Sequence, residues 1–166
     1  MRKNRIIKII VAAVIAAATV IIDQITKYFV SSNMFVGEQI DVIPKVLRWT
    51  YVQNRGAAFG SLSNARWIFL VASVVLILVI CIYLLKSEKI SSFQSVMLAL
   101  ILGGGIGNMI DRIALGYVVD FVDFYFIPLW HWVFNVADAC VCVGGILFAV
   151  SLLFDESTKK GQSKNG

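Results

Sequence analysis

Four long apolar segments set the strongest limit on what this 166-residue chain can fold into. The clearest is Trp67–Leu85, nineteen consecutive residues without a charged side chain. About 20 apolar residues are enough for a helix to cross the hydrocarbon core of a membrane, where the backbone must satisfy its own hydrogen bonds. We therefore predict four transmembrane helices, over residues 6–28, 67–85, 90–110 and 133–154.

The composition favours a membrane protein over a soluble one. Apolar residues make up 59% of the chain and charged residues 15%, whereas a soluble domain has about 45–50% apolar and about 25% charged residues. The predicted fold class is mainly α: an integral membrane four-helix bundle formed by one domain over residues 1–155. A polar segment over residues 156–166 is expected to be a disordered cytoplasmic tail.

Lysines and arginines at the ends of the predicted helices indicate the orientation of the chain. They lie before or in the first turn of the first helix, between the second and third, and after the fourth: Arg2, Lys3, Arg5, Lys8, Lys86, Lys89, Lys159, Lys160 and Lys164. With four spans these segments share one side, which the positive-inside rule makes cytoplasmic, so both termini are expected inside the cell. The net charge of +5 then reflects topology, and no nucleic-acid partner is expected.

The first apolar segment has an alternative interpretation as a cleavable signal peptide, because basic residues precede an alanine-rich run. Ala16–Ala18 offer small residues for a cleavage site. The run continues past these alanines to Asp23 and Lys27, whose polar side chains need protein neighbours inside a membrane. A retained helix is therefore the favoured interpretation.

The segment after the first helix has the alternation of β-strands. Ile40 and Val42 alternate with polar residues, as do Trp49 and Tyr51, and Pro44-Lys45 between them is a turn signal. We predict a small antiparallel sheet over about residues 36–60, on the extracytoplasmic side, with Trp49, Tyr51 and Phe59 dipping into the membrane interface.

Polar residues gather at the predicted outer ends of the helices. In so apolar a chain such residues are informative, because polar groups near hydrocarbon are costly. They can converge at one depth near the outer surface: Asp23, Asn54, Asn108, Asp111, Arg112, Asp120, Asn135 and Asp138. This convergence predicts a functional site, and the alternative is a set of interfacial helix caps and helix–helix hydrogen bonds.

Two of these carboxylates are the best candidates for chemistry. Asp111 adjoins Arg112, and one of them can pair with the other or with a nearby amide, which is typical of a structural carboxylate. Asp120, in contrast, lies among apolar residues, and Asp138 shares a helix face with Asn135. Two buried aspartates held close together share one proton near neutral pH. One carboxyl can then take a proton from water while the other polarises a carbonyl and protonates a leaving amine, as peptide hydrolysis requires.

Other chemistries have less support in the sequence. The single histidine, His131, lies between Trp130 and Trp132 in a pattern typical of an aromatic interface belt. No set of metal ligands with a zinc spacing is visible, so no metal and no cofactor are expected. A small proton-coupled transporter remains an alternative because intramembrane aspartates often mark ion paths, as does a membrane assembly factor packed through Gly103-x-x-x-Gly107.

Five sequence blocks in order resemble the lipoprotein signal peptidase (type II signal peptidase) family. They are Asp23-Gln-Ile-Thr-Lys27, Asn54-Arg-Gly-Ala-Ala-Phe-Gly60, Gly107-Asn-Met-Ile-Asp-Arg112, Gly116-Tyr-Val-Val-Asp-Phe121 and Phe134-Asn-Val-Ala-Asp138. The resemblance implies a bacterial inner-membrane aspartyl endopeptidase that cuts prolipoproteins just before a diacylglyceryl-cysteine. The implied partners are lipidated precursors and membrane lipids, and a monomer is expected.

The resemblance also implies roles for particular residues. Asp120 and Asp138, selected above on physical grounds, match the catalytic pair of the family. Supporting residues match Asp23, Lys27, Asn54, Gly56, Asn108, Arg112 and Asn135. We expect the three asparagines and Arg112 to orient the substrate backbone and the aspartates. Asp23 is expected beside the bound peptide, and Lys27 is expected to reach the outer segment or lipid headgroups.

Overall fold

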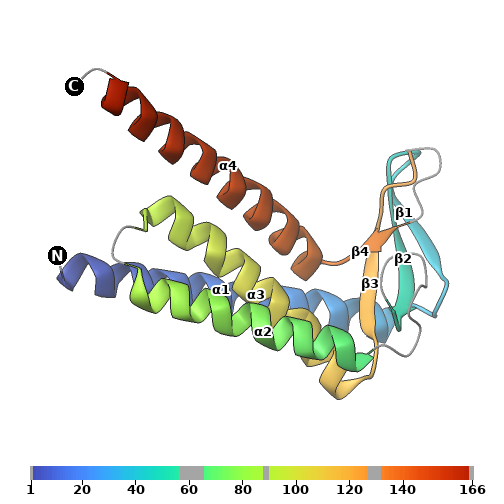
Figure 1. The fold of residues 1–166 in the computed structure, drawn as a ribbon. Helices are drawn as coiled ribbons and strands as arrows, with labels where there is room; N and C mark the ends of the chain where they lie inside the picture. Colours follow the sequence, from blue (N-terminus) through green and yellow to red (C-terminus); the bar gives the residue numbers. More distant parts are fainter. Residues whose placement is uncertain (1, 57–65, 88–89, 127–131, 165–166) are drawn as a thin grey trace.

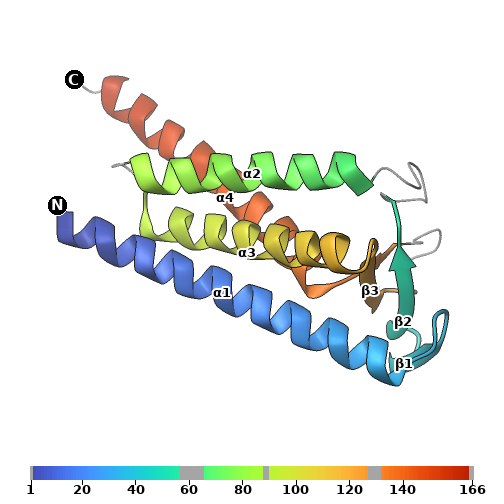
Figure 2. The ribbon, with the colours of Figure 1, turned by 90° about the horizontal axis from the view of Figure 1, so that it is seen from below.

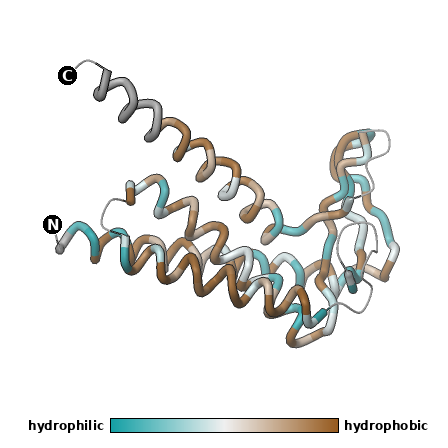
Figure 3. The backbone as a smooth tube through the Cα atoms, in the orientation of Figure 1, coloured by the Kyte–Doolittle hydropathy of each residue, from teal (hydrophilic) through white to brown (hydrophobic). Residues whose placement is uncertain are grey.

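A computed structural model describes residues 2–56, 66–87, 90–126 and 132–164. It contains four helices: α1 (Arg2–Asn33), α2 (Arg66–Lys86), α3 (Ser92–Ala114) and α4 (Val136–Lys164). Within the described ranges, each helix includes a stretch long and apolar enough to cross a membrane. Figure 3 shows these apolar stretches as long brown segments of the helices. The predicted fold class, a four-helix membrane bundle with a small sheet, is confirmed.

α3 is the central helix of the bundle and packs against each of the other three. More than half of its most apolar stretch is buried inside the protein, against about a fifth or less in the others. Small residues make this close packing possible, because membrane helices associate mainly through van der Waals contact. A Cβ atom at Gly103 would lie 2.6 Å from Thr19 Cβ of α1, and one at Gly144 of α4 would lie 2.7 Å from the Met97 carbonyl oxygen of α3.

A four-stranded antiparallel sheet covers one end of the bundle (Figure 1). Its strands, in spatial order, are β1 (Gln39–Ile43), β2 (Leu47–Asn54), β3 (Val118–Asp123) and β4 (Val133–Phe134). The β1–β2 hairpin turns at Pro44-Lys45, as predicted, and Lys45 adopts a φ of 63°. The sequence analysis had placed only the first outer segment in the sheet. The second outer segment supplies β3 and β4, whose pairing depends on contacts far apart in sequence.

The sheet packs on the end of α1 through a small apolar core. Val30 of α1 and Met34, directly after α1, cluster with Tyr51, Val119 and Phe121 of the sheet. Tyr51 is therefore only 4% exposed, and the Trp49 ring packs edge-on against the rings of Phe29 and Phe121. Both aromatic rings therefore find apolar partners within the protein, while the expected dipping of Trp49 and Tyr51 into the membrane interface stays a prediction.

The chain ends lie at the end of the bundle opposite the sheet (Figures 1 and 2). The connection between α2 and α3 lies there too, and Lys8 near the start of α1 donates a hydrogen bond to the Ile90 carbonyl at 2.7 Å. α4 continues as a helix to Lys164, which differs from the disordered tail predicted from residue 156. Extending an existing helix is easier than nucleating a new one. The predictions for Phe59, Trp130, His131 and residues 165–166 fall outside the described residues.

Candidate active site

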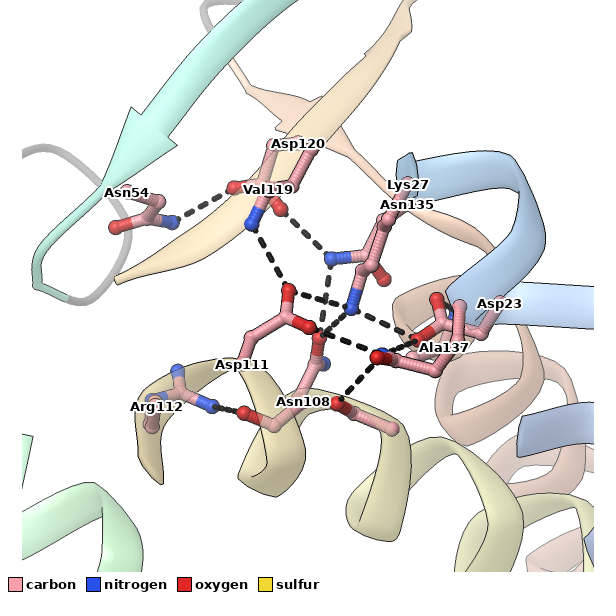
Figure 4. Close-up of polar contacts among 12 residues, drawn as sticks. Asp23, Lys27, Asn54, Asn108, Asp111, Arg112, Val119, Asp120, Asn135 and Ala137 are labelled. Atoms are coloured by element: carbon pink, nitrogen blue, oxygen red, sulfur yellow. Dashed lines mark hydrogen bonds and ion pairs between the residues drawn. The ribbon is translucent and has the colours of Figure 1, made fainter. Parts of the chain in front are cut away.

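The predicted polar residues converge where the sheet meets the helices. Figure 4 shows Asp120 on β3 between Asn54 of β2 and Asn135, with Asn108 and Asp111 of α3 below it. Asp138 lies in the first turn of α4. Strand β3 is held in place by pairing with β2, in a register that puts Asp120 opposite Val52. The site therefore forms only when strands and helices from both halves of the chain assemble.

Asp120 is buried and accepts one hydrogen bond on each carboxylate oxygen. Asp120 is only 2% exposed. Asn54 Nδ2 donates to Oδ2 at 2.9 Å and Asn135 Nδ2 donates to Oδ1 at 2.7 Å. Burial, and then the negative charge of Asp138, raise the pKa of Asp120 to about 7, although these hydrogen bonds and the charge of Lys27 oppose the shift. Asp120 can therefore hold a proton near neutral pH.

Asp138 also accepts a hydrogen bond on each carboxylate oxygen. Asn108 Nδ2 donates to Oδ1 at 2.7 Å, and the backbone amide of Asn135 donates to Oδ2 at 3.3 Å. The backbone amide of Asp138 donates in return to Asn135 Oδ1 at 2.8 Å. This reciprocal arrangement is that of a capping box, with Asn135 as the N-cap of α4. It fixes the Asp138 carboxylate at the helix N-terminus, where the helix dipole favours negative charge.

Asn135 and Asn108 link the two aspartates into one network. The Asn135 amide nitrogen that donates to Asp120 also donates to Asn108 Oδ1 at 3.1 Å. Asn108 in turn donates to Asp138. Two buried or half-buried carboxyls therefore lie in a single hydrogen-bonded cluster, and the charge of one influences the protonation of the other.

A buried ion cluster lies beneath this network. Lys27 Nζ is 2.8 Å from Asp23 Oδ2, 3.1 Å from Asp111 Oδ2 and 2.9 Å from Asn108 Oδ1. Lys27 is only 2% exposed and Asp23 is fully buried. The structure thus places both side chains inside the protein, where Lys27 bonds to Asp23, Asp111 and Asn108. The expected position of Asp23 beside a bound peptide stays a prediction. Asp111 forms its ion pair with Lys27 of α1 and accepts hydrogen bonds from the amides of Gln24 and Val119, so the predicted pairing with a nearby amide is the alternative that the structure shows.

The remaining predicted residues surround the site. The Arg112 guanidinium lies 5.2 Å from the centre of the Phe69 ring and donates to the Asn108 carbonyl at 3.3 Å. The Gly56 amide donates to Asn54 Oδ1 at 3.1 Å and so helps to aim the Asn54 Nδ2 group at Asp120. In the described part of the chain, no group of three or more His, Cys, Asp or Glu residues could hold a metal ion.

The sequence analysis missed Gln24, which joins two of the buried carboxylates. Its Nε2 group lies 2.9 Å from Asp111 Oδ1 and 3.2 Å from both Asp23 Oδ2 and the Gly107 carbonyl oxygen. Its position beside Asp23, in a helix otherwise rich in apolar residues, was the available signal.

The comparison with known families decides the identity of this arrangement. A family model described as "Signal peptidase (SPase) II" matches residues 15–154. The chain belongs to the signal peptidase II family. It is therefore a peptidase, a hydrolase held in the membrane by several helices. The transporter hypothesis has no support from this family.

Relatives and solved structures agree with the family assignment. Proteins named "Lipoprotein signal peptidase" from Symbiobacterium thermophilum, Clostridioides difficile and Caldanaerobacter subterraneus subsp. tengcongensis are 45%, 42% and 45% identical. The matches cover 81%, 84% and 86% of this chain and 90%, 92% and 96% of theirs.

Two solved bacterial membrane enzyme structures, both determined by the in meso method, are also similar. One matches with a TM-score of 0.84 and 35% identity over 90% of this chain and 91% of that chain. The other matches with a TM-score of 0.79 and 34% identity over 86% of this chain and 92% of that chain. These values support the same membrane fold for this signal peptidase II family member.

Proposed function

We propose that this chain removes signal peptides from lipid-modified bacterial prolipoproteins, and that Asp120 and Asp138 are its catalytic pair. The family and the names of its relatives support the reaction. The observation that carries the residue assignment is the pairing of two aspartates from separate elements, β3 and α4, in one network. Each of their four carboxylate oxygens accepts a hydrogen bond from an asparagine.

The pair supplies both proton transfers that peptide hydrolysis needs. Asp120, with a pKa of about 7, carries the shared proton and donates it to the oxygen of the scissile carbonyl. Asp138 takes a proton from a water molecule, whose oxygen then bonds to the carbonyl carbon. When the tetrahedral intermediate collapses, the C–N bond breaks and the proton on Asp138 passes to the leaving amine. Asp120 recovers its proton as the new carboxyl carbonyl forms, so the enzyme returns to its starting state.

The neighbouring polar groups hold this pair and the substrate in register. Asn54 and Asn108 each donate from Nδ2 to one aspartate, and the Arg112 guanidinium has five N–H donors, of which one bonds to the Asn108 carbonyl. We assign Arg112 and Asn54 to the substrate backbone on either side of the scissile bond. The cut lies just before the diacylglyceryl-cysteine, whose acyl chains stay in the surrounding lipid.

The enzyme is proposed to sit in the bacterial cytoplasmic membrane with its sheet and active site facing outward. Basic residues gather at the opposite end, where both chain ends and the α2–α3 connection lie, and such residues favour the cytoplasm. A signal peptide ends at the outer surface of this membrane, which matches the position of the aspartates. The single domain over residues 1–155 acts as a monomer.

A pair of isosteric variants tests the assignment. Asp120→Asn and Asp138→Asn keep the size of each side chain but cannot exchange the proton, so each should lower cleavage of a lipidated precursor by at least about 1,000-fold. Asp41→Asn is the matched control, because Asp41 is an exposed aspartate of β1, and it should cleave at the normal rate. Normal cleavage by either buried variant would refute the catalytic pair.

The substrate class requires a second comparison. Purified enzyme in lipid–detergent micelles should cleave a precursor bearing a diacylglyceryl-cysteine far faster than the same precursor without the lipid. Equal rates for the two precursors would contradict the role of the lipid while leaving the aspartic pair intact.

A further inference from the structure

The two residues that directly precede the proposed catalytic aspartates are held in the same way. The backbone amide of Val119, next to Asp120, donates to Asp111 Oδ2 at 3.0 Å. The backbone amide of Ala137, next to Asp138, donates to Asp23 Oδ1 at 2.9 Å. Both acceptors are carboxylates from transmembrane helices, α3 and α1 respectively. Each aspartate therefore has a fixed point in the backbone one residue away.

A single lysine joins these two fixed points. Lys27 Nζ contacts both Asp23 Oδ2 and Asp111 Oδ2, at 2.8 and 3.1 Å. Figure 4 shows the resulting chain of contacts, which runs from Val119 through Asp111, Lys27 and Asp23 to Ala137. Gln24 provides a second connection, since its Nε2 group lies within 3.2 Å of both carboxylates. We name Asp23, Lys27 and Asp111 the ionic brace.

We infer that the ionic brace positions the two catalytic aspartates by fixing the separation between β3 and the N-terminus of α4. This inference rests on the proposed function. Its three members are positioning residues, because they act through the backbone of Val119 and Ala137.

Two features support a positioning role for the ionic brace: its residues are buried, and they connect separate helices and strands. All three members of the brace are at most 3% exposed, so their contacts are shielded from water and from salt. A buried ion cluster is a poor source of stability, because desolvating the charges offsets most of their attraction. The ionic brace instead restricts geometry, because buried charged groups must stay within bonding distance of their partners. Strand β3 and α4 both contact α1 and α3, and the brace connects their backbones through side chains of those two helices.

The protein also packs tightly around the ionic brace, with no room for an added side chain at Gly107. A Cβ atom at Gly107 of α3 would lie 2.5 Å from Asp23 Oδ2, so only a residue without a side chain lets Asp23 reach the Ala137 amide. The first N–H groups of a helix have no partner within the helix, and Asp23 supplies one for α4 from a separate element.

The test compares variants of the brace with a matched buried aspartate. Three variants alter the brace: Asp111→Asn, Asp23→Asn and Lys27→Met. Asp123→Asn alters another ion pair on β3, the strand that carries Val119. Asp123 is 5% exposed and bonds to Arg48 Nε at 2.6 Å and Thr50 at 2.9 Å. Melting temperature, kcat, KM and amide hydrogen exchange at Val119 and Ala137 are measured for each full-length variant in micelles with a lipidated precursor.

A positioning role predicts a loss in kcat that exceeds any loss of folded protein. A displacement of about 1 Å at reacting groups costs about 100-fold in rate, so the brace variants should lose about 100-fold in kcat with KM little changed. Exchange at Val119 and Ala137 should be faster. Asp123→Asn should lower the melting temperature with kcat and the two exchange rates unchanged. Brace variants with normal kcat, or losses equal to those of Asp123→Asn, would overturn the inference.

Two additions keep the outcome clear. If a brace variant fails to fold, Gln24→Met removes the weaker connection without leaving a charge unpaired, and a kcat decrease of about 10-fold is expected; an unchanged kcat counts against the brace. Asp120→Asn is measured in the same assay. Cleavage by Asp120→Asn refutes the proposed catalytic pair, whereas its loss together with normal kcat in the brace variants refutes the brace alone.

Discussion

Asn135 and Asp138 form two hydrogen bonds with each other: the Asn135 backbone amide donates to Asp138 Oδ2 at 3.3 Å, and the Asp138 backbone amide donates to Asn135 Oδ1 at 2.8 Å. The same asparagine donates from its side chain to Asp120 at 2.7 Å. One residue therefore caps α4, holds one aspartate through the backbone and hydrogen-bonds to the other. The start of the last helix and the geometry of the aspartic pair depend on the same side chain.

Asn135→Ser separates these two roles. Serine is as good an N-cap as asparagine but has no amide group to reach Asp120. We expect the melting temperature to stay near that of the wild type while kcat falls by about 10- to 100-fold, the range for loss of a charge-assisted hydrogen bond of about 1.5–3 kcal/mol. Asn135→Ala, which also loses the cap, should be less stable by about 1 kcal/mol. A serine variant with normal kcat would contradict the role of the side-chain amide.

The pKa of Asp120 predicts a change of stability with pH. In the folded protein this pKa is about 7, above the ordinary value of 3.8, chiefly because of burial. Between these two values the folded chain holds a proton that the unfolded chain has released. The stability from this group is therefore present at low pH and decreases as the pH rises through 7.

Asp120→Asn removes this titration, because asparagine stays neutral. The melting temperature of the wild type minus that of Asp120→Asn should decrease between about pH 5 and about pH 8. Asp41→Asn, which changes an exposed aspartate, should show no such trend. A difference that is constant across this range would mean that Asp120 is ionised throughout.

The same group sets the basic side of the activity profile. In kcat/KM, which reports the free enzyme, activity should decrease above about pH 7 as the shared proton is lost. The charges that act on Asp120 include Asp138 of α4, Lys27 of α1 and Arg112 of α3. Lys27→Met should move this limb to higher pH, because Lys27 lowers the pKa of Asp120. Initial rates across a pH series locate this basic limb in the wild type and in Lys27→Met.

Gly107→Ala should be harmful although alanine is the better helix former. The added methyl group would lie 2.5 Å from Asp23 Oδ2, so Asp23 must move away from Ala137. Crowding of this kind costs about 1–3 kcal/mol of stability, and cleavage should fall with it. Gly105→Ala is the control on the same helix, since its Cβ would meet only Ile77 Cγ1 at an ordinary 3.8 Å. Thermal unfolding and precursor cleavage distinguish the two.

Chelators should leave cleavage unchanged. In the proposed mechanism the two aspartates carry out both proton transfers with their own carboxyl groups, so the reaction would need no bound Lewis acid. Rates measured before and after dialysis against EDTA should agree. Loss of activity that zinc restores would refute the aspartic mechanism.

Much of the fold was predictable because the hydropathy pattern of a membrane helix or a strand is contained within a short stretch of sequence. Trp67–Leu85 is apolar along its whole length, and the structure has α2 over Arg66–Lys86. The hairpin followed from alternation at Ile40 and Val42 and from its Pro44-Lys45 turn. Strand β3 was not predicted, because Val118–Asp123 is nearly uniformly buried and its apolar run has no clear alternation. Its partner β2 lies more than sixty residues earlier in the chain.

The sequence by itself determined that the chain crosses a membrane and that its rare polar residues mark one site, because a charge in hydrocarbon is too costly to occur without a purpose. The tertiary structure alone decided what each charge contacts. Lys27 and Asp23 lie inward in a buried cluster with Asp111, since only the packing of α1 against α3 brings those carboxylates together. Spacing in the sequence specifies which residues share a helix face, and packing determines which residues meet across two helices.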